Sequence, residues 1–205
     1  MLKNYLSRYK VIIWDFDGTI KDSELRKNNA YFILFQNLNS SCLKGMEQYL
    51  KDNIGISRES KITGCMELIG LEISSENIKR YLDQFAEIAC TEVIASEWIE
   101  EVKIYIEENY KNQILYLVTQ TPQHEIEQLL SQLNFFKYFK NIHGGLKSKV
   151  SCIDKIINNE KIPKSLIAVV GDSQGDSEAA YLCGVDFYKK NHSYNKEVKS
   201  YKGTF

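Results

Sequence analysis

The chain has 205 residues, the length of one domain with or without a modest insertion, and its 43% hydrophobic and 26% charged residues exclude a disordered or low-complexity protein. Its 26 basic and 27 acidic residues leave a net charge of −1, which gives no overall attraction to nucleic acid or to an anionic membrane. Its longest apolar runs have about five residues, far short of the roughly 20 that span a bilayer, so we expect neither a nucleic acid nor a membrane as a partner.

The first predicted element in chain order is a buried strand over Tyr9–Trp14, which is a short apolar run with β-branched residues at its centre. It stops at Asp-Phe-Asp-Gly-Thr, and no strand signal follows for about 75 residues. Helical spacing fills this long stretch, and we expect helices at Asp22–Leu38, Leu43–Ile54, Ser57–Ile69 and Ser74–Ala95.

From Ser96 onward, predicted helices alternate with short apolar strands. The strands are expected at Gln113–Val118, Asn141–Gly144, Leu166–Val170 and Val185–Tyr188. The helices are expected at Trp98–Tyr110, Thr121–Leu133, Val150–Asn158 and Asp176–Cys183, the second with Thr121 as its cap and Pro122 as its first residue. The basic tail from Lys189 is expected to be a solvated terminus.

Alternating strands and helices predict βαβ units and therefore an α/β fold with a parallel sheet. The helical block between the first and second strands is too long for a simple crossover, so we interpret it as an inserted helical subdomain. Five scattered cysteines form no Cys-x-x-Cys pair, and no secretory leader precedes the first strand. We expect them to be reduced thiols in a cytoplasmic protein.

The sequence places two carboxylates at the end of the first strand, in Asp15-Phe16-Asp17-Gly18-Thr19. Residues two apart in a strand face the same side, so Asp15 and Asp17 are expected to point together. Carboxylates this close repel unless a proton or a cation lies between them, and Mg²⁺ accepts such oxygen ligands. The alternative is a pair of solvated aspartates.

Three further strand ends carry polar residues of matching chemistry. Asp172 and Asp176 follow the Leu166–Val170 strand, although Asp176 alone could be a helix cap. Thr119 ends another strand just before a helix start, where a hydroxyl and backbone N–H groups can bind an anion. The loop before Val150 contains Lys147 and Lys149. Together these residues supply acids that can bind a metal, a nucleophile, and hydroxyl and ammonium donors for a phosphoryl group. Phosphoryl transfer requires this set of groups.

With these motifs, the sequence resembles the haloacid dehalogenase superfamily, in particular its phosphatases with a small α-helical cap, similar to phosphoglycolate phosphatase and β-phosphoglucomutase. The motif DFDGT at 15–19 is the most specific match, Thr119 and Lys149 match the second and third motifs, and GDSQGD at 171–176 matches the fourth. The resemblance implies a Rossmann-like three-layer core of residues 1–20 and 96–205, with a helical cap of residues 21–95.

The resemblance also implies a role for each motif residue. Asp15 would be the nucleophile that forms an aspartyl-phosphate, and Asp17 the general acid and base. Mg²⁺ would be held by Asp15, the Asp17 carbonyl and Asp172, with Asp176 supporting its water shell. Thr119 and Lys149 would hold the phosphoryl oxygens, with the N–H groups of Gly18 and Thr19 as further donors.

Two assignments stay open at this point. Lys147 competes with Lys149, because many relatives have a proline after the third-motif lysine whereas Val150 follows here. In the cap, Arg58 is a candidate contact to an anionic substrate, with Lys61 nearby, and the alternative is an exposed arginine at a helix start.

We therefore expect a Mg²⁺-dependent phosphatase that acts on a small phosphorylated metabolite such as a sugar phosphate, as a monomer or weak homodimer. The alternatives are a phosphomutase on the same scaffold and a catalytically silent binding module. Asp17 argues against dehalogenation, because the dehalogenases of the superfamily lack the second aspartate of the first motif.

Overall fold

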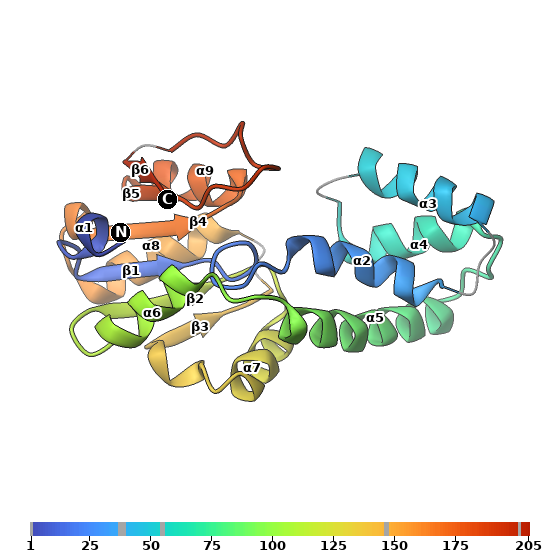
Figure 1. The fold of residues 1–205 in the computed structure, drawn as a ribbon, viewed down its shortest axis with the longest axis horizontal. Coiled ribbons are helices and arrows are strands. Elements are labelled where there is room, and N and C mark those ends of the chain that lie inside the picture. The colour runs from blue at the N-terminus through green and yellow to red at the C-terminus, as the bar shows by residue number, and fades with distance from the viewer. Residues whose placement is uncertain (1, 37–39, 54–55, 146–147, 201) are drawn as a thin grey trace. The chain divides into compact units, whose positions relative to one another are not determined.

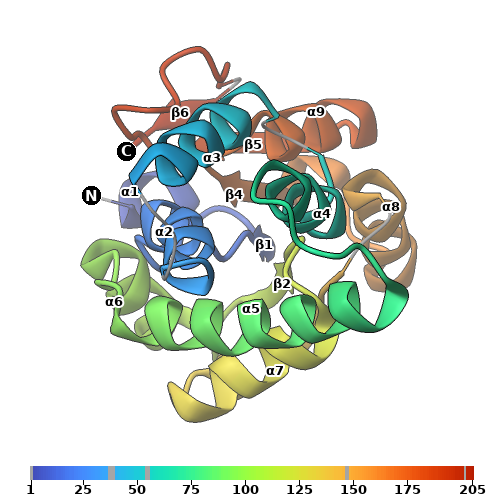
Figure 2. The same ribbon diagram turned by 90° about the vertical axis from the view of Figure 1, so that its right-hand side faces the viewer.

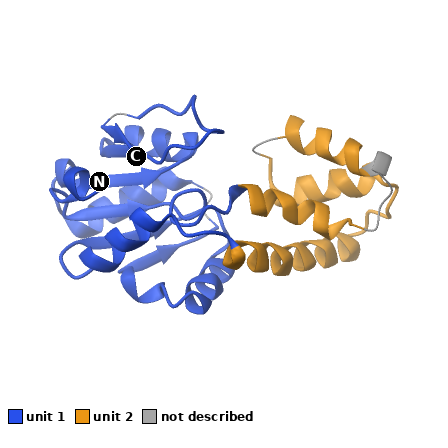
Figure 3. Cartoon of the chain, in the orientation of Figure 1, with its two compact units in different colours: residues 1–24, 96–205 blue, residues 25–95 orange. Residues whose placement is uncertain are grey.

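The computed structural model describes residues 2–36, 40–53, 56–145, 148–200 and 202–205 (Figure 1). The chain divides into two compact units, which are coloured separately in Figure 3. Unit 1 comprises Met1–Glu24 and Ser96–Phe205, and unit 2 comprises Leu25–Ala95. The helical unit thus begins at residue 25, whereas the insertion was expected from the sequence to start at residue 21.

The described part of unit 1 contains a sheet of six parallel strands in the order β3-β2-β1-β4-β5-β6. In chain order, the strands are β1 (Val11–Trp14), β2 (Ile114–Val118), β3 (Asn141–His143), β4 (Ile167–Gly171), β5 (Asp186–Lys189) and β6 (Gly203–Thr204). The predicted α/β fold with a parallel sheet is confirmed. The two-residue strand β6 was not predicted.

The register of the sheet aligns the strand ends that carry the polar motifs. Trp14 pairs with Leu117 on one side and with Val170 on the other. The N–H of Asp15 then donates to the Val170 carbonyl at 2.9 Å. From β1 the chain proceeds to β2 and β3 on one side, and it returns to β4 on the other side. The gap beyond β1 and β4 is therefore the topological switch point, where open α/β sheets place their ligands.

Helices cover both faces of this sheet, which makes a three-layer core. The helices of the core are α1 (Lys3–Leu6), α6 (Glu100–Asn109), α7 (Gln123–Gln132), α8 (Lys149–Glu160) and α9 (Gln174–Cys183). Two short 3-10 turns are η1 (Phe136–Tyr138) and η2 (Lys164–Leu166). Figure 2 shows α6 and α7 on one side of the strands and α8 and α9 on the other.

The apolar side chains of β1 alternate between these two layers. Val11 and Ile13 belong to the cluster that contains Ile153 of α8 and Ala180 of α9. The ring of Trp14 lies on the other face, 6.0 Å from that of Tyr105 in α6. This period of two explains why a strand buried on both faces is a continuous apolar run in the sequence.

The described residues of unit 2 form helices and the segments that connect them. Its helices are α2 (Glu24–Leu34), α3 (Ser40–Asp52), α4 (Arg58–Leu68) and α5 (Ser75–Ala95). Tyr31 and Phe85, with ring centroids 4.4 Å apart, pack in its core with Met46 and Ile62. No helix in the described part of either unit is sufficiently long and apolar to cross a membrane.

The two segments of unit 1 that lead into and out of the helical insertion lie side by side. The N–H of Asp22 donates to the Glu97 carbonyl at 2.9 Å, and the N–H of Ile99 donates to the Ile20 carbonyl at 3.0 Å. Between these bonds, Lys21 is buried, with its Nζ 2.5 Å from the Ser96 carbonyl and 4.5 Å from the Trp98 ring centroid.

The prediction of a solvated C-terminal tail is wrong at several residues. Lys189 is buried, and its ammonium donates to the carbonyls of Asn195 at 3.2 Å and Val198 at 2.9 Å. The side chain of Asn195 is also buried, and β6 extends the sheet beside β5. Apolar methylenes of a lysine can be buried when its charge meets carbonyl oxygens, and composition alone does not show this.

Candidate active site

Both aspartates of the first motif are buried directly after β1, and each has specific partners. Oδ1 of Asp15 accepts a hydrogen bond from the Lys149 ammonium at 2.8 Å. The carboxylate of Asp17 accepts two, from the Ser23 hydroxyl at 2.6 Å and the Thr121 hydroxyl at 2.9 Å. They are therefore not a pair of solvated aspartates at a strand end.

Lys149 is the first residue of α8, and it is 9% exposed. Ser148 caps this helix by accepting a hydrogen bond from the Ser151 N–H at 3.3 Å. The lysine ammonium lies 2.8 Å from Asp15 Oδ1 and 2.6 Å from Asp176 Oδ1, so it bridges residues that are far apart in the sequence. The competing candidate, Lys147, lies outside the described residues.

The fourth motif follows β4 and turns directly into α9. Ser173 caps α9 and forms a reciprocal capping box with Asp176, whose Oδ2 accepts from the Ser173 N–H at 3.1 Å and hydroxyl at 2.5 Å. Asp176 thus both completes the capping box of α9 and accepts from the Lys149 ammonium. Gly171 is required here, because a Cβ on it would lie 2.5 Å from Cγ of Asp176.

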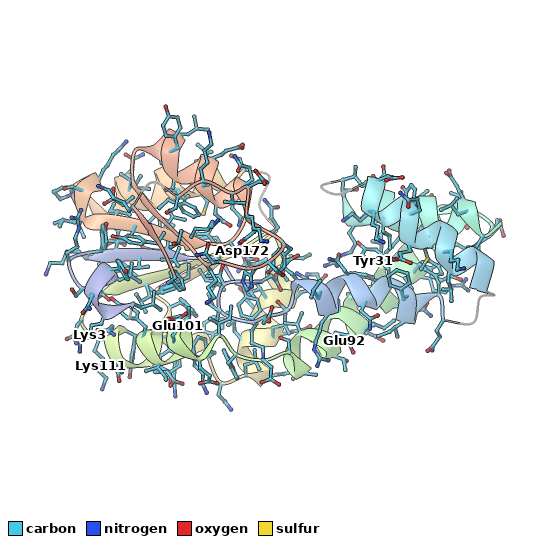
Figure 4. The ribbon with its side chains drawn as sticks, turned by 45° about the horizontal axis from the view of Figure 1, so that its top comes forward. Lys3, Tyr31, Glu92, Glu101, Lys111 and Asp172 are labelled. Atoms are coloured by element: carbon cyan, nitrogen blue, oxygen red, sulfur yellow. The ribbon has the colours of Figure 1, made fainter. Side chains whose placement is uncertain are left out.

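Asp15, Asp172 and Asp176 bring carboxylate oxygens within 4.8 Å of one another, and all three residues are buried. Asp172, labelled in Figure 4, follows the last residue of β4. Among the described residues, the ammonium that forms ion pairs with this cluster is that of Lys149. The site therefore holds more negative than positive charge.

Burial and the excess of negative charge raise the pKa values of two carboxyl groups in this cluster. Burial raises the pKa of Asp172 to about 7, helped by Glu24 and Asp176 and opposed by Lys149. Burial and the Asp176 carboxylate likewise hold the pKa of Asp15 well above its usual range. Burial alone would lower the pKa of Lys149, but the two carboxylates outweigh it and raise that pKa. A bound divalent cation would relieve this repulsion, because it favours the ionised carboxylates.

The remaining predicted residues of unit 1 lie in the same region. Thr119, buried at the end of β2, accepts a hydrogen bond from the Thr121 N–H at 3.2 Å, which leaves its own hydroxyl hydrogen to donate elsewhere. The predicted donors of the first motif are used within their turn, because the N–H of Gly18 donates to the Lys21 carbonyl at 2.7 Å and that of Thr19 to the Phe16 carbonyl at 3.3 Å.

Thr121 has a different role from the helix cap predicted for it. Helix α7 begins at Gln123, and Pro122 occupies the capping position, which has no side-chain hydrogen bond. The Thr121 hydroxyl instead orients Asp17. Sequence reasoning also missed Ser23 as the second partner of Asp17, since a serine six residues after an aspartate forms no recognisable pattern with it.

Arg58, predicted to contact the substrate, belongs to unit 2. Its guanidinium carbon lies 4.9 Å from the ring centroid of Phe85, and Nζ of Lys61 lies 5.9 Å from that of Tyr31. The structure thus brings the predicted residues of unit 1 together at the carboxyl ends of the strands. The ring contacts of Arg58 and Lys61 are to residues of their own helical unit.

A comparison with protein families matches residues 12–190 to the model for haloacid dehalogenase-like hydrolases. The chain belongs to this family. A phosphorylated carbohydrates phosphatase from Thermotoga maritima is 26% identical to this haloacid dehalogenase-like hydrolase over 198 residues, which cover 91% of the chain and 87% of that protein.

Solved structures of related proteins have the same fold. A Thermotoga maritima protein provisionally named a beta-phosphoglucomutase has a TM-score of 0.75 at 21% identity, covering 96% of this chain and 94% of that one. The provisional haloacid dehalogenase-type hydrolase YfnB of Bacillus subtilis, bound to magnesium, has a TM-score of 0.74 at 18% identity, covering 97% and 94%. These likenesses confirm the Rossmann-like fold of the hydrolase.

Proposed function

We propose that this haloacid dehalogenase-like hydrolase is a Mg²⁺-dependent phosphatase that acts on a small phosphomonoester, with Asp15 as its nucleophile. One observation carries the proposal: Asp15, Asp172 and Asp176 are buried within 4.8 Å of one another at the switch point of the sheet. The similarity to a phosphorylated carbohydrates phosphatase supports a sugar phosphate as the substrate. The described cysteines Cys65, Cys90, Cys152 and Cys183 are thiols and not disulfides, which is compatible with a cytoplasmic enzyme.

In the first step, a carboxylate oxygen of Asp15 attacks the phosphorus atom of the substrate. A bond forms between that oxygen and phosphorus, and the bond from phosphorus to the alcohol oxygen breaks. Lys149, 2.8 Å from Asp15, offsets the negative charge that the incoming phosphate adds to the site. The Thr119 hydroxyl, at the same edge of the sheet, donates to a phosphoryl oxygen in this scheme.

Asp17 is the proton carrier in this scheme. It gives a proton to the departing alcohol oxygen, and it later takes one from the water that attacks phosphorus and restores the Asp15 carboxylate. The products are the free alcohol and inorganic phosphate. The hydroxyls of Ser23 and Thr121, at 2.6 and 2.9 Å, hold the Asp17 carboxylate in one orientation through both steps.

The donor set suits Mg²⁺, because this ion prefers carboxylate and carbonyl oxygens. Asp15, Asp172 and the main-chain carbonyl of Asp17 would hold it. Asp176 is already engaged by Lys149 and Ser173, so its part is to fix the lysine and the turn. Bound Mg²⁺ supplies positive charge against the phosphate and the acid cluster.

The test is hydrolysis of a panel of sugar phosphates and other small phosphomonoesters with Mg²⁺, measured as released inorganic phosphate. Asp15→Asn should reduce kcat on the order of 10⁴-fold or more, since it removes the nucleophile. The matched control is Glu178→Gln on the exposed part of α9, which should keep full activity.

Two results would contradict the proposal: activity that survives in Asp15→Asn, and activity that is unchanged when a chelator removes the metal. The same panel separates a phosphatase from a phosphomutase, because a mutase isomerises the sugar phosphate without releasing inorganic phosphate.

A further inference from the structure

A loop near the C-terminus, His192–Asn195, contacts both of the chain segments that carry the acid cluster. It follows β5, and no motif of the sequence pointed to it. The structure places it against the turn after β1, at Gly18, and against the end of β4, at Asp172. These two segments are separated by more than 150 residues of chain and come together at the candidate metal site.

The loop holds Asp172 at both its side chain and its backbone. The Tyr194 hydroxyl donates to Oδ2 of Asp172 at 3.3 Å. The buried side-chain amide of Asn195 donates to the main-chain carbonyl of Asp172 at 2.8 Å and to that of Lys190 at 2.8 Å. The carboxylate of Asp172 therefore has a donor on one oxygen and a fixed peptide behind it.

The loop also holds the turn of the first motif. Nε2 of His192 lies 2.6 Å from the Gly18 carbonyl, and it must be the donor because a carbonyl only accepts. The His192 and Tyr194 rings are stacked, with centroids 4.7 Å apart and planes within 8° of parallel. Gly18 fits so closely that a Cβ there would lie 2.3 Å from Oδ2 of Asp172 and 3.0 Å from the Tyr194 hydroxyl.

The loop is itself anchored on the core. The buried ammonium of Lys189 donates to the Asn195 carbonyl at 3.2 Å. The N–H of Asn191 donates to the Phe205 carbonyl at 2.8 Å, and the N–H of Phe205 donates to the Lys189 carbonyl at 3.1 Å. The Lys189 ammonium thus holds the last residue of the loop, and the bonds to Phe205 hold the residues just before it.

We propose that the loop His192–Asn195 positions the metal-binding groups, with Tyr194 and His192 as positioning residues for Mg²⁺. This inference rests on the proposed function. Before the cation binds, Asp172 and Asp15 repel each other, and the loop keeps their segments together in spite of that repulsion. Groups held in place in advance lose less conformational freedom on binding, so the cation binds more tightly.

The test is calorimetric titration of Mg²⁺ into the full chain without substrate, comparing the wild type with Tyr194→Phe. This change removes the hydroxyl and keeps the ring on His192. The Kd for Mg²⁺ should rise about 10-fold, as for other groups that orient metal ligands. Because Tyr194 does not touch the reacting atoms, the effect should appear mainly in the Kd, and kcat at saturating Mg²⁺ should fall by a smaller factor than the Kd rises. The matched control is Tyr110→Phe, just after α6, which should bind Mg²⁺ like the wild type.

His192→Leu tests the second contact, and His192→Gln is its conservative partner because a glutamine Nε2 can donate to the Gly18 carbonyl. His192→Leu should weaken Mg²⁺ binding by a similar factor, and His192→Gln should restore most of it. A purely structural role would lower the urea midpoint of the metal-free protein without this pattern of rescue.

The inference is wrong if the wild type binds Mg²⁺ and releases phosphate while Tyr194→Phe and His192→Leu bind the ion equally tightly. It is also wrong if their binding falls only in step with their stability. If the wild type neither binds Mg²⁺ nor releases phosphate, the proposed function itself is wrong, and this inference fails with it.

Discussion

Carboxylates lie at both ends of the sheet in unit 1, partly buried at the amino end and buried at the carboxyl end, and their charges are neutralised in different ways. At the amino end of β5, Asp186 accepts from the Tyr9 hydroxyl at 2.6 Å and from Arg8 at 3.1 Å, with Lys202 3.5 Å away. At the carboxyl end, Lys149 forms ion pairs with both Asp15 and Asp176. The carboxylate of Asp172 accepts a hydrogen bond from the Tyr194 hydroxyl.

The two clusters differ in whether the protein itself neutralises their negative charge. At the amino end, cations and a hydroxyl surround one carboxylate, so its charge is satisfied within the protein. At the carboxyl end, several buried carboxylates share one lysine in the described part of the chain, and the pKa values of Asp15 and Asp172 rise. Negative charge that the fold itself does not neutralise is suited to a bound cation.

Removal of Lys149 should disturb the carboxyl end most. Lys149→Met leaves Asp15 and Asp176 buried without their counter-ion, so kcat should fall on the order of 10³-fold. The free energy of unfolding at pH 8 should fall by about 3 kcal/mol, because breaking a buried pair leaves uncompensated charge. Phosphate release and urea unfolding measure the two effects.

The control for this variant is Lys140→Met. Lys140 forms an ion pair with Glu160 at 2.6 Å, but its side chain is 53% exposed. The Glu160 side chain is only 7% exposed, but it keeps the Tyr116 hydroxyl as a donor, so the loss of this pair should cost only about 1 kcal/mol and leave kcat unchanged. Equal losses in the two variants would show that Lys149 has no special part in the site.

The pH dependence of stability is the second way to sharpen the comparison. The pKa of Asp172 is about 7 in the folded protein, against its usual 3.8. Between these values the folded chain holds a proton that the unfolded chain has released, so stability without metal falls as pH rises through this range. From pH 5 to pH 8 the loss is about 2 to 3 kcal/mol, and Mg²⁺ should remove it by favouring the ionised carboxylate.

Urea midpoints from pH 5 to pH 8 with and without Mg²⁺ measure this effect. Asp172→Asn is the control that isolates it, because the asparagine has no proton to release. Without metal, the variant should become more stable relative to the wild type as pH rises. A difference in stability that shifts in favour of the wild type as pH rises would contradict the assignment.

The smallest effect is expected at the amino end. Asp186→Asn removes a charge but retains an oxygen that can accept from Tyr9, so the free energy of unfolding should fall by only about 1 kcal/mol. Both kcat and the Kd for Mg²⁺ should be unchanged, since the substitution lies at the opposite end of the strands. A change in either value of more than about threefold would remove the distinction between the two clusters.

The parts of the fold that were predictable depend on local pattern. Buried parallel strands such as Val11–Trp14 are continuous apolar runs, and their ends are marked by acids, because ligands and turns both lie there. This local signal is sufficient to predict Asp15 and Asp172 as site residues from the order of amino acids alone.

The rest depends on contacts between residues far apart in the chain. Thr121 stands beside Pro122 and has the appearance of a helix cap, yet its hydroxyl is directed to Asp17, 104 residues earlier. His192 and Tyr194 lie in a polar, lysine-rich tail whose composition predicts solvation. Their stacking and their bonds to Gly18 and Asp172 arise only when the sheet has formed.

The paired segments around Lys21 and Ser96 have a consequence for how such proteins can change over time. The polypeptide departs from the α/β domain and returns to it at a single junction, sealed by the Lys21 ammonium on the Ser96 carbonyl. A segment inserted at that junction does not change the order of the strands or the spacing of the motifs on either side of it. Helical inserts of different length and sequence can therefore be exchanged there without disturbing the strand ends that carry Asp15 and Asp172.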